Sequence, residues 1–373
     1  MKKALKRLQP VIGILVSLIL LYIVLFKPQF KAWSDGDLSL FAALFSVPRI
    51  QFADLVTAWH IIDFWYAGLA ILLLILSLFI RTFRWKIIIE EVGPTSFWTV
   101  FHSMNVGYML NNILPLRAGE LLRGIIVGRR SNLPSTAMIA SVVVERIFDL
   151  AGLVVAFGSV IAFYPFPGWV RGAGGALSIV ILVMLITAVV LSHSTNRLKK
   201  WNALKLEGKP KILQTLRDRF LELLDGLSVL KSGKAMIHVT WTSLSLTTIY
   251  ILVMQVVLSA FHFTDGTYPL LAEVPFVKAA VLTLITSLGF AIPSAPGGVG
   301  TYHASVLLGL SWFDVPEGLA VIFAAVMHAV NYITLTLFGF IGLWRLKLSF
   351  SDVLKTSRGE NDAETGTSIP EEE

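Results

Sequence analysis

Long apolar segments are the feature that most limits how this chain can fold. A run of about 20 predominantly apolar residues is long enough to cross the hydrocarbon core of a bilayer as one helix. Charged residues make up only 15% of the chain, against about 25% in a soluble domain. We therefore predict an all-α polytopic membrane protein with about six full spans. The predicted spans cover residues 11–26, 61–80, 144–163, 174–192, 236–261 and 318–343.

Basic residues beside the apolar runs predict the topology, because cytoplasmic loops carry an excess of Lys and Arg. Four such residues precede the first run, which indicates an uncleaved span with a cytoplasmic N-terminus; a cleaved signal peptide is the alternative. We expect a multi-pass protein of the cell (inner) membrane with both termini cytoplasmic. The net charge of +7 then reflects topology, and we expect no nucleic-acid partner. The other cytoplasmic markers are Arg81, Arg84, Lys86, Arg129, Arg130, Arg345 and Lys347.

Two segments interrupted by proline and glycine fit no simple span. Residues 97–130 have basic residues on both sides, so we expect them to enter and leave the membrane at the cytoplasmic face. Residues 276–311 lie between acidic external loops, so we expect them to enter from outside. Irregular backbone at membrane depth is tolerated where protein or a cavity covers it. We therefore predict two re-entrant broken-helix hairpins.

The two hairpins resemble each other in sequence. NNILPLRAGELL aligns with GFAIPSAPGGVG, which pairs Pro115 with Pro293 and Gly119 with Gly297. Such broken segments in two halves of opposite orientation indicate an inverted repeat of the transporter type; chance similarity of short loops is the alternative. The predicted transmembrane domain covers residues 1–348 and a disordered polar tail covers 349–373. Within the domain we place half one at 61–165, a cytoplasmic amphipathic segment at 194–235 and half two at 236–345.

Charged residues in the first hairpin form the first candidate site. Arg117 and Arg123 flank Glu120, and in a helix starting near Ala118 the Glu120 and Arg123 side chains can pair. A guanidinium group suits bidentate contact with phosphate, so we expect Arg117 or Arg123 to bind an anionic headgroup. A salt-bridge network that only braces the hairpin is the alternative.

A second group of charges begins the predicted third span. Glu145 and Asp149 share a helix face, with Arg146 beside them. We expect the two carboxylates to neutralise Arg117 and Arg123; acid–base chemistry or proton carriage is the alternative. Asn112, Tyr302 and His303 complete the headgroup-binding candidates. The predicted gating residues are Pro115, Gly119, Pro293, Pro296, Gly297, Gly298 and Gly300.

The segment 194–235 combines a leucine-rich stripe with many basic residues. This pattern predicts an amphipathic helix, either simply solvated or attracting anionic phospholipids. Cysteine is absent and the histidines show no metal-binding spacing, so we expect no cofactor and no metal.

Three motifs together resemble the membrane domain of lysylphosphatidylglycerol synthases, the multiple peptide resistance factor proteins, over residues 10–345. The resemblance implies a flippase-like domain in a stand-alone form without the aminoacyltransferase domain. The matching residues are Leu114, Pro115, Arg117, Ala118, Gly119, Glu120 and Arg123, then Glu145, Arg146 and Asp149, then Pro293, Pro296, Gly297, Gly298 and Gly300.

From these patterns we expect a lipid flippase that moves an anionic lipid, phospho- or polyprenyl-phosphate-linked, and that is not an enzyme. The expected partners are the lipid substrate, anionic phospholipids at the basic segment and a homo-oligomer as an open alternative. A membrane-embedded transferase acting on a lipid headgroup or lipid-linked sugar is the alternative function. A scaffold or regulatory membrane protein is a third hypothesis.

Overall fold

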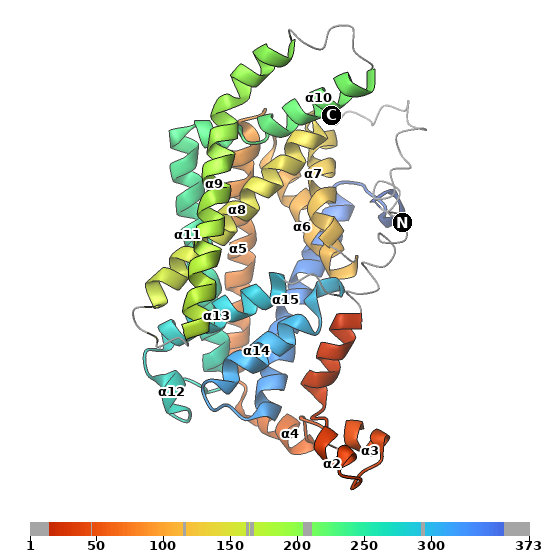
Figure 1. Cartoon of the computed structure of the whole chain (residues 1–373), viewed down its shortest axis with the longest axis vertical. Coiled ribbons are helices and arrows are strands. Elements are labelled where there is room, and N and C mark those ends of the chain that lie inside the picture. Colours follow the sequence, from red (N-terminus) through yellow and green to blue (C-terminus); the bar gives the residue numbers. More distant parts are fainter. Residues whose placement is uncertain are drawn as a thin grey trace.

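The computed structural model describes residues 15–45, 47–114, 117–161, 164, 168–203, 211–291 and 295–353. These residues form an elongated bundle of helices (Figure 1). The described residues contain no β-sheet, only an isolated β-bridge between Phe26 and Pro48. The predicted all-α class is confirmed.

Four of the described helices are long and apolar enough to cross a membrane. Three of them are whole elements, and the fourth is the central part of α9, Gly168–Ala203. The four spans are α5 (Phe64–Glu90), residues Gly174–Ser194 of α9, α11 (Gly233–Ala260) and α15 (Glu317–Arg345). At a rise of 1.5 Å per residue, a helix of 27 residues is about 40 Å long and crosses the hydrocarbon core.

The helix α8, Ser135–Val160, was expected as a further span and falls outside this set. Its 26 residues are enough in length. However, every 18-residue window along it contains Glu145, Arg146 and Asp149, and polar groups of this kind need protein partners at membrane depth. The expected first span is described in part, as the apolar helix Leu15–Leu25.

Two helical hairpins enter the bundle from opposite ends (Figure 1). The first, formed by α6, Phe97–Ile113, and α7, Ala118–Arg130, follows the C-terminal end of α5. The second comprises α13, Pro275–Ala291, the 3-10 turn η3, Pro296–Gly298, and α14, Thr301–Ser311. Their outer ends define two ends of the molecule, which we call the α7 end and the α12 end.

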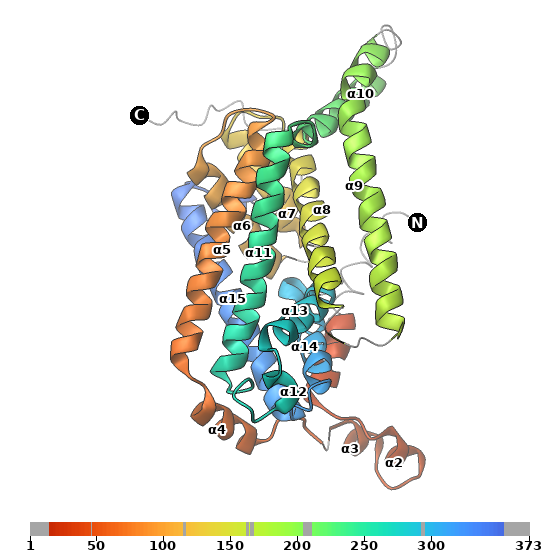
Figure 2. The same cartoon turned by 90° about the vertical axis from the view of Figure 1, so that its left-hand side faces the viewer.

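The long helices alternate in direction around the hairpins. The helices α5 and α15 run from the α12 end to the α7 end, whereas α8 and α11 run the opposite way (Figures 1 and 2). In chain order, the first hairpin therefore lies between α5 and α8, and the second lies between α11 and α15. The long helices that flank the second hairpin run in directions opposite to those that flank the first. This arrangement has the form that the sequence predicted for an inverted repeat.

Small residues let the first hairpin pack closely against α15. A Cβ atom at Gly342 would lie 2.8 Å from the carbonyl oxygen of His102, and one at Gly339 would lie 2.9 Å from that of Asn105. Close backbone approach through small residues is how helices associate where lipid surrounds them. By contrast, only 11% of the α9 span is buried, against 50% for α11, so most of α9 faces outward.

Shorter helices occupy the two ends. At the α12 end lie α2, Phe30–Ser34, α3, Leu40–Phe45, α4, Phe52–Ile61, and α12, Pro269–Ala272 (Figure 2). At the α7 end, α10, Lys211–Asp225, and the 3-10 turn η2, Ser228–Lys231, follow α9. The predicted amphipathic helix is present there: α10 exposes Leu216, Phe220 and Leu223 and buries Leu224.

The predicted tail begins later than expected. Residues 350–353 are helical, and Val353 is buried against Leu343 and Leu346. The apolar side chain of Val353 thus extends the packed domain past residue 348. The rest of the predicted tail, 354–373, lies outside the described residues.

Candidate functional site

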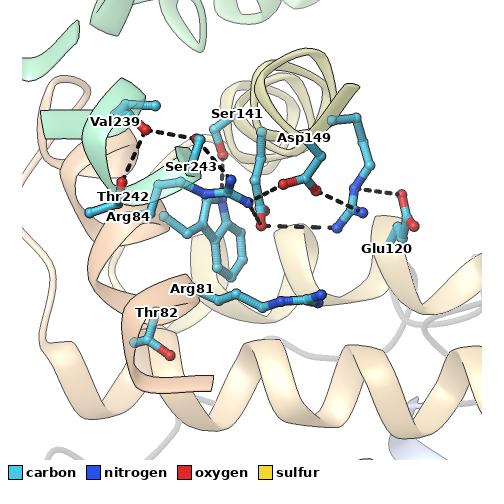
Figure 3. Close-up of polar contacts among 12 residues, drawn as sticks. Arg81, Thr82, Arg84, Glu120, Ser141, Asp149, Val239, Thr242 and Ser243 are labelled. Atoms are coloured by element: carbon cyan, nitrogen blue, oxygen red, sulfur yellow. Dashed lines mark hydrogen bonds and ion pairs between the residues drawn. The ribbon is translucent and has the colours of Figure 1, made fainter. Parts of the chain in front are cut away.

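Six charged side chains from three helices meet inside the bundle near the α7 end; Figure 3 labels three of them, Arg84, Glu120 and Asp149. Arg84 comes from α5, two of the residues come from α7, and three come from α8. We call this group the ionic cluster. Its members are Arg84, Glu120, Arg123, Glu145, Arg146 and Asp149.

Glu145 lies at the centre of the ionic cluster. One carboxylate oxygen accepts a hydrogen bond from Arg84 Nη2 at 2.9 Å, and the other accepts one from Arg123 Nη2 at 2.7 Å. All three side chains are 0 or 1% exposed. Removing one partner of such a buried pair typically costs about 3–5 kcal/mol, because the other charge is left without compensation. Glu145 therefore ties α5 and α7 to α8.

The remaining members of the cluster are partly exposed. Arg146 contacts Asp149 at 3.0 Å and Glu120 at 3.5 Å, and Arg84 contacts Asp149 at 2.7 Å. The expected pairing of Glu120 with Arg123 is wrong. Although the two residues are three positions apart on α7, the Arg123 guanidinium turns to the buried Glu145, where low dielectric strengthens the attraction.

Several polar hydrogens in the cluster have no hydrogen-bond acceptor within the described structure. They are carried by Nε and Nη1 of Arg123, by Nε and Nη2 of Arg146, and by the hydroxyl of Tyr108. The Arg123 guanidinium stacks 4.6 Å from the Trp85 ring centre. Buried donors normally have partners, so these groups could serve a ligand with several acceptor oxygens.

The tips of the two hairpins touch through Arg117. Its Nη2 donates a hydrogen bond to the carbonyl oxygen of Phe290, and its guanidinium lies 5.0 Å from the centre of the Phe290 ring. Arg117 has a left-handed backbone with φ of 54°, an uncommon conformation for a residue other than glycine. The side chain is half-buried, and no carboxylate of the described residues forms an ion pair with it.

Asn112 connects the first hairpin to α15. Its Nδ2 donates to Thr336 Oγ1 at 3.0 Å and to the Tyr332 carbonyl oxygen at 3.3 Å, while the Tyr332 hydroxyl donates to the Asn112 carbonyl oxygen at 3.2 Å. These bonds fix the end of α6 against α15 just before the interrupted segment.

Tyr302 and His303 lie in a separate aromatic group. His328 of α15 stacks on His303 with ring centres 4.9 Å apart and on Tyr332 at 5.8 Å, and Tyr302 approaches His328 at 5.3 Å. Neither residue forms a hydrogen bond or ion pair with the ionic cluster in the described structure. The predicted headgroup candidates thus divide into two groups, and Asn112 is connected to the aromatic group through Tyr332.

The predicted gating residues lie where backbone segments approach closely. A Cβ at Gly119 would overlap the carbonyl oxygen of Gly107, so glycine is needed where α7 crosses α6. Gly297, with φ of 70°, packs against Tyr332. Pro296 begins η3, and Gly298 and Gly300 also have positive φ. Pro115 and Pro293 lie outside the described residues.

Arg84 and Arg81 were taken for cytoplasmic topology markers, and that interpretation of Arg84 is wrong. Helix α5 continues to Glu90, so Arg84 lies about 9 Å inside its C-terminal end. Its Nη1 also donates to Ser243 at 3.0 Å. The apolar run Ile87–Ile89 after the basic residues was the sequence signal that the helix continues beyond Arg84.

Two open surface hollows are lined by residues outside the ionic cluster. One, of about 530 Å³, is lined by Leu343–Arg345 and Lys347–Ser349. The other, of about 350 Å³, lies between Phe79 and Thr242. Among the described residues, no group of three His, Asp or Glu side chains is placed to hold a metal ion.

Comparison with known proteins decides the family. The Lysylphosphatidylglycerol synthase TM region family matches residues 11–339. The chain belongs to this family. The resemblance found in the three motifs is thereby confirmed, and with the apolar helices it establishes a multi-pass membrane protein.

Two curated relatives extend the comparison. The UPF0104 membrane protein MJ1595 of Methanocaldococcus jannaschii is 24% identical over 298 residues, which is 76% of this chain and 85% of that protein. The glycosyltransferase AglD of Haloferax volcanii is 24% identical over 324 residues, covering 76% of this chain and 49% of that protein. No solved structure matches the chain.

The expectation that the chain is not an enzyme is contradicted by the second relative. A protein that resembles three quarters of this chain is named for glycosyl transfer.

Proposed function

We propose that this chain moves a lipid with an anionic headgroup across the bilayer, the headgroup being phospho- or polyprenyl-phosphate-linked. The observation that carries the proposal is the contact of Arg117 with Phe290. It joins the tips of two hairpins that enter from opposite ends, which is the arrangement used for substrate sites in inverted-repeat transporters. Family membership supports a membrane role but leaves the substrate to experiment.

The proposed translocation uses Arg117 as an exchangeable contact. A phosphate oxygen is a stronger acceptor for guanidinium than the neutral Phe290 carbonyl, because both partners are then charged. Binding of the headgroup would release the second hairpin from the first. The lipid tails would stay in the bilayer while the hairpins separate on one side and then on the other.

The orientation and the lipid contacts belong to the same proposal. We place the protein in the cell membrane with the α7 end cytoplasmic, because the segment 194–235 around α10 carries ten of the 31 Lys and Arg residues. There, α10 would contact anionic phospholipids through its basic rim and its exposed Leu216 and Phe220. Residues 61–165 and 236–345 would act as the two halves that rock against each other.

Reconstituted vesicles test the proposal. Vesicles containing the purified full chain and a headgroup-labelled phosphatidylglycerol report translocation as label that becomes accessible to an external quencher. We expect Arg117→Ala to slow translocation about tenfold, the value of one charge-assisted hydrogen bond. The exposed Arg345→Ala serves as the matched control. Equal rates for wild type and Arg117→Ala would refute the assigned role.

A transferase acting on a lipid headgroup or lipid-linked sugar is the second candidate, favoured by the name of the relative AglD. In the ionic cluster, Asp149 is the carboxylate best placed for such a role, because its side chain is 27% exposed whereas Glu145 is fully buried. Product formed by purified protein from an activated sugar and a polyprenyl phosphate, and lost in Asp149→Asn, would support it. No product with wild type would remove this candidate.

A further inference from the structure

We propose that Arg81, in addition to Arg117, binds the phosphate group of the ligand, at a second site formed with Tyr108 and Tyr250. Arg81 belongs to α5 and lies one turn before Arg84. The proposal rests in part on the proposed handling of an anionic lipid, but it makes a separate claim about binding. It starts from the charge balance of the ionic cluster.

The ionic cluster is neutral by itself. Its three guanidinium groups, from Arg84, Arg123 and Arg146, contact three carboxylates. Arg81 lies beside this group and forms no ion pair with a carboxylate among the described residues; Figure 3 shows it extended alongside the cluster. Its positive charge is therefore left over at a depth where charge is costly.

The surroundings of Arg81 hold the guanidinium in place without neutralising it. Its Nε donates a hydrogen bond to the Tyr250 hydroxyl. The guanidinium carbon lies 5.0 Å from the ring centres of both Tyr108 and Tyr250. Two aromatic faces offset part of the cost of desolvation. The formal charge remains, however, and no carboxylate of the described residues pairs with the two Nη groups.

Tyr108 supplies an independent observation. The residue is only 6% exposed, and its hydroxyl oxygen interacts with the Arg81 guanidinium, but the hydroxyl hydrogen has no acceptor within the described structure. A buried hydroxyl of this kind usually has a partner. Because Tyr108 also lies over the Arg81 guanidinium, a single group bearing several acceptor oxygens and one negative charge would satisfy both.

A phosphate diester has these properties. It carries one negative charge, which matches the one that Arg81 leaves over, and its oxygens accept the paired Nη hydrogens of a guanidinium in a bidentate fork. A lipid headgroup and free phosphate share this chemistry. The nearby Nε and Nη1 of Arg123, which have no acceptor within the described structure, could serve the remaining oxygens.

Binding measurements on the full chain in a neutral detergent test the assignment. The probes are dioleoylphosphatidylglycerol, dioleoylglycerol, which lacks the phosphate, and inorganic phosphate. We expect wild type to bind phosphatidylglycerol more tightly than dioleoylglycerol, and Arg81→Gln to weaken that binding about tenfold. Arg81→Lys should recover part of the affinity, because it keeps the charge but loses the fork.

Two further variants keep the test decisive. Tyr108→Phe removes only a hydroxyl whose hydrogen has no acceptor within the described structure, so it should fold normally and weaken phosphatidylglycerol binding about threefold. Lys86→Gln, on the same helix, is the control and should bind like wild type. Unchanged binding in Arg81→Gln and Tyr108→Phe, or equal affinity for dioleoylglycerol, would overturn the assignment.

The binding and translocation measurements together distinguish this inference from the proposed function. Phosphatidylglycerol binding that depends on Arg81, without translocation in vesicles, would support the site and refute the flippase. Translocation by wild type together with unchanged binding in Arg81→Gln would do the reverse. Inorganic phosphate that binds as tightly as phosphatidylglycerol, with the same loss in Arg81→Gln, would assign the site to a free anion instead of a lipid.

Discussion

The hairpin α6–α7 and the hairpin α13–α14 meet at their tips but are held by different chemistry. The first carries Arg117, Glu120 and Arg123 near its tip, and buried ion pairs fix it to α5 and α8. The second has glycines with positive φ at its tip, and histidine and tyrosine rings pack it on α15. Apolar and aromatic contacts are less directional than a buried ion pair, so the second hairpin is the one expected to move during a cycle.

The largest expected loss of stability comes from changing Glu145, which connects the first hairpin to α5 and α8. Glu145→Gln removes the charge that Arg84 and Arg123 share, so we expect it to lower the free energy of unfolding by about 3–5 kcal/mol. Denaturant unfolding in detergent micelles measures it. The exposed Glu91→Gln is the control and should change little; a loss below about 1 kcal/mol for Glu145→Gln would mean that the pairs do not hold the hairpin.

Close packing within the first hairpin gives the next effect. Gly119→Ala places a methyl group on the carbonyl oxygen of Gly107, so we expect a loss of about 1–3 kcal/mol from overpacking. The control is Gly68→Ala on α5, which has open space around it and should stabilise the helix by about 0.5–1 kcal/mol. Similar results for both substitutions would contradict the close crossing of α6 and α7.

The tip of the second hairpin should be affected less by the same kind of change. Gly297→Ala forces alanine into a left-handed conformation near Tyr332, at a cost of about 1–2 kcal/mol. Because the described residues of this hairpin form no ion pair with the rest of the bundle, we expect amide hydrogen exchange to increase in residues 295–303 without spreading to α7. Faster exchange across both hairpins would show that they open as one unit.

The smallest effect should come from the bonds that join the first hairpin to α15. Tyr332→Phe removes the hydrogen bond to the Asn112 carbonyl oxygen, so we expect a loss of about 0.5–1.5 kcal/mol. Asn112→Ala removes two more bonds and should cost somewhat more. Unfolding experiments on both variants measure these losses, and an unchanged free energy of unfolding in Tyr332→Phe would contradict the hydrogen bond to the Asn112 carbonyl oxygen.

Pattern and charge were enough to predict much of the fold. Apolar runs located α5, α11 and α15, and the Pro- and Gly-broken segments located both hairpins, since span length and breaker residues are local properties. The same reasoning was wrong about Arg84. A basic residue near the end of an apolar run resembles a topology marker, and local sequence does not show that Glu145 lies opposite it.

The sequence by itself determined that this is a polytopic helical membrane protein, that two broken segments interrupt its spans, and that Arg123, Glu145, Arg146 and Asp149 belong to one polar region. Only the tertiary structure decided which charges pair. It turned Arg123 from Glu120 to Glu145, added Arg84, and left Arg81 without a carboxylate, because pairing at membrane depth depends on distances between helices that are far apart in the chain.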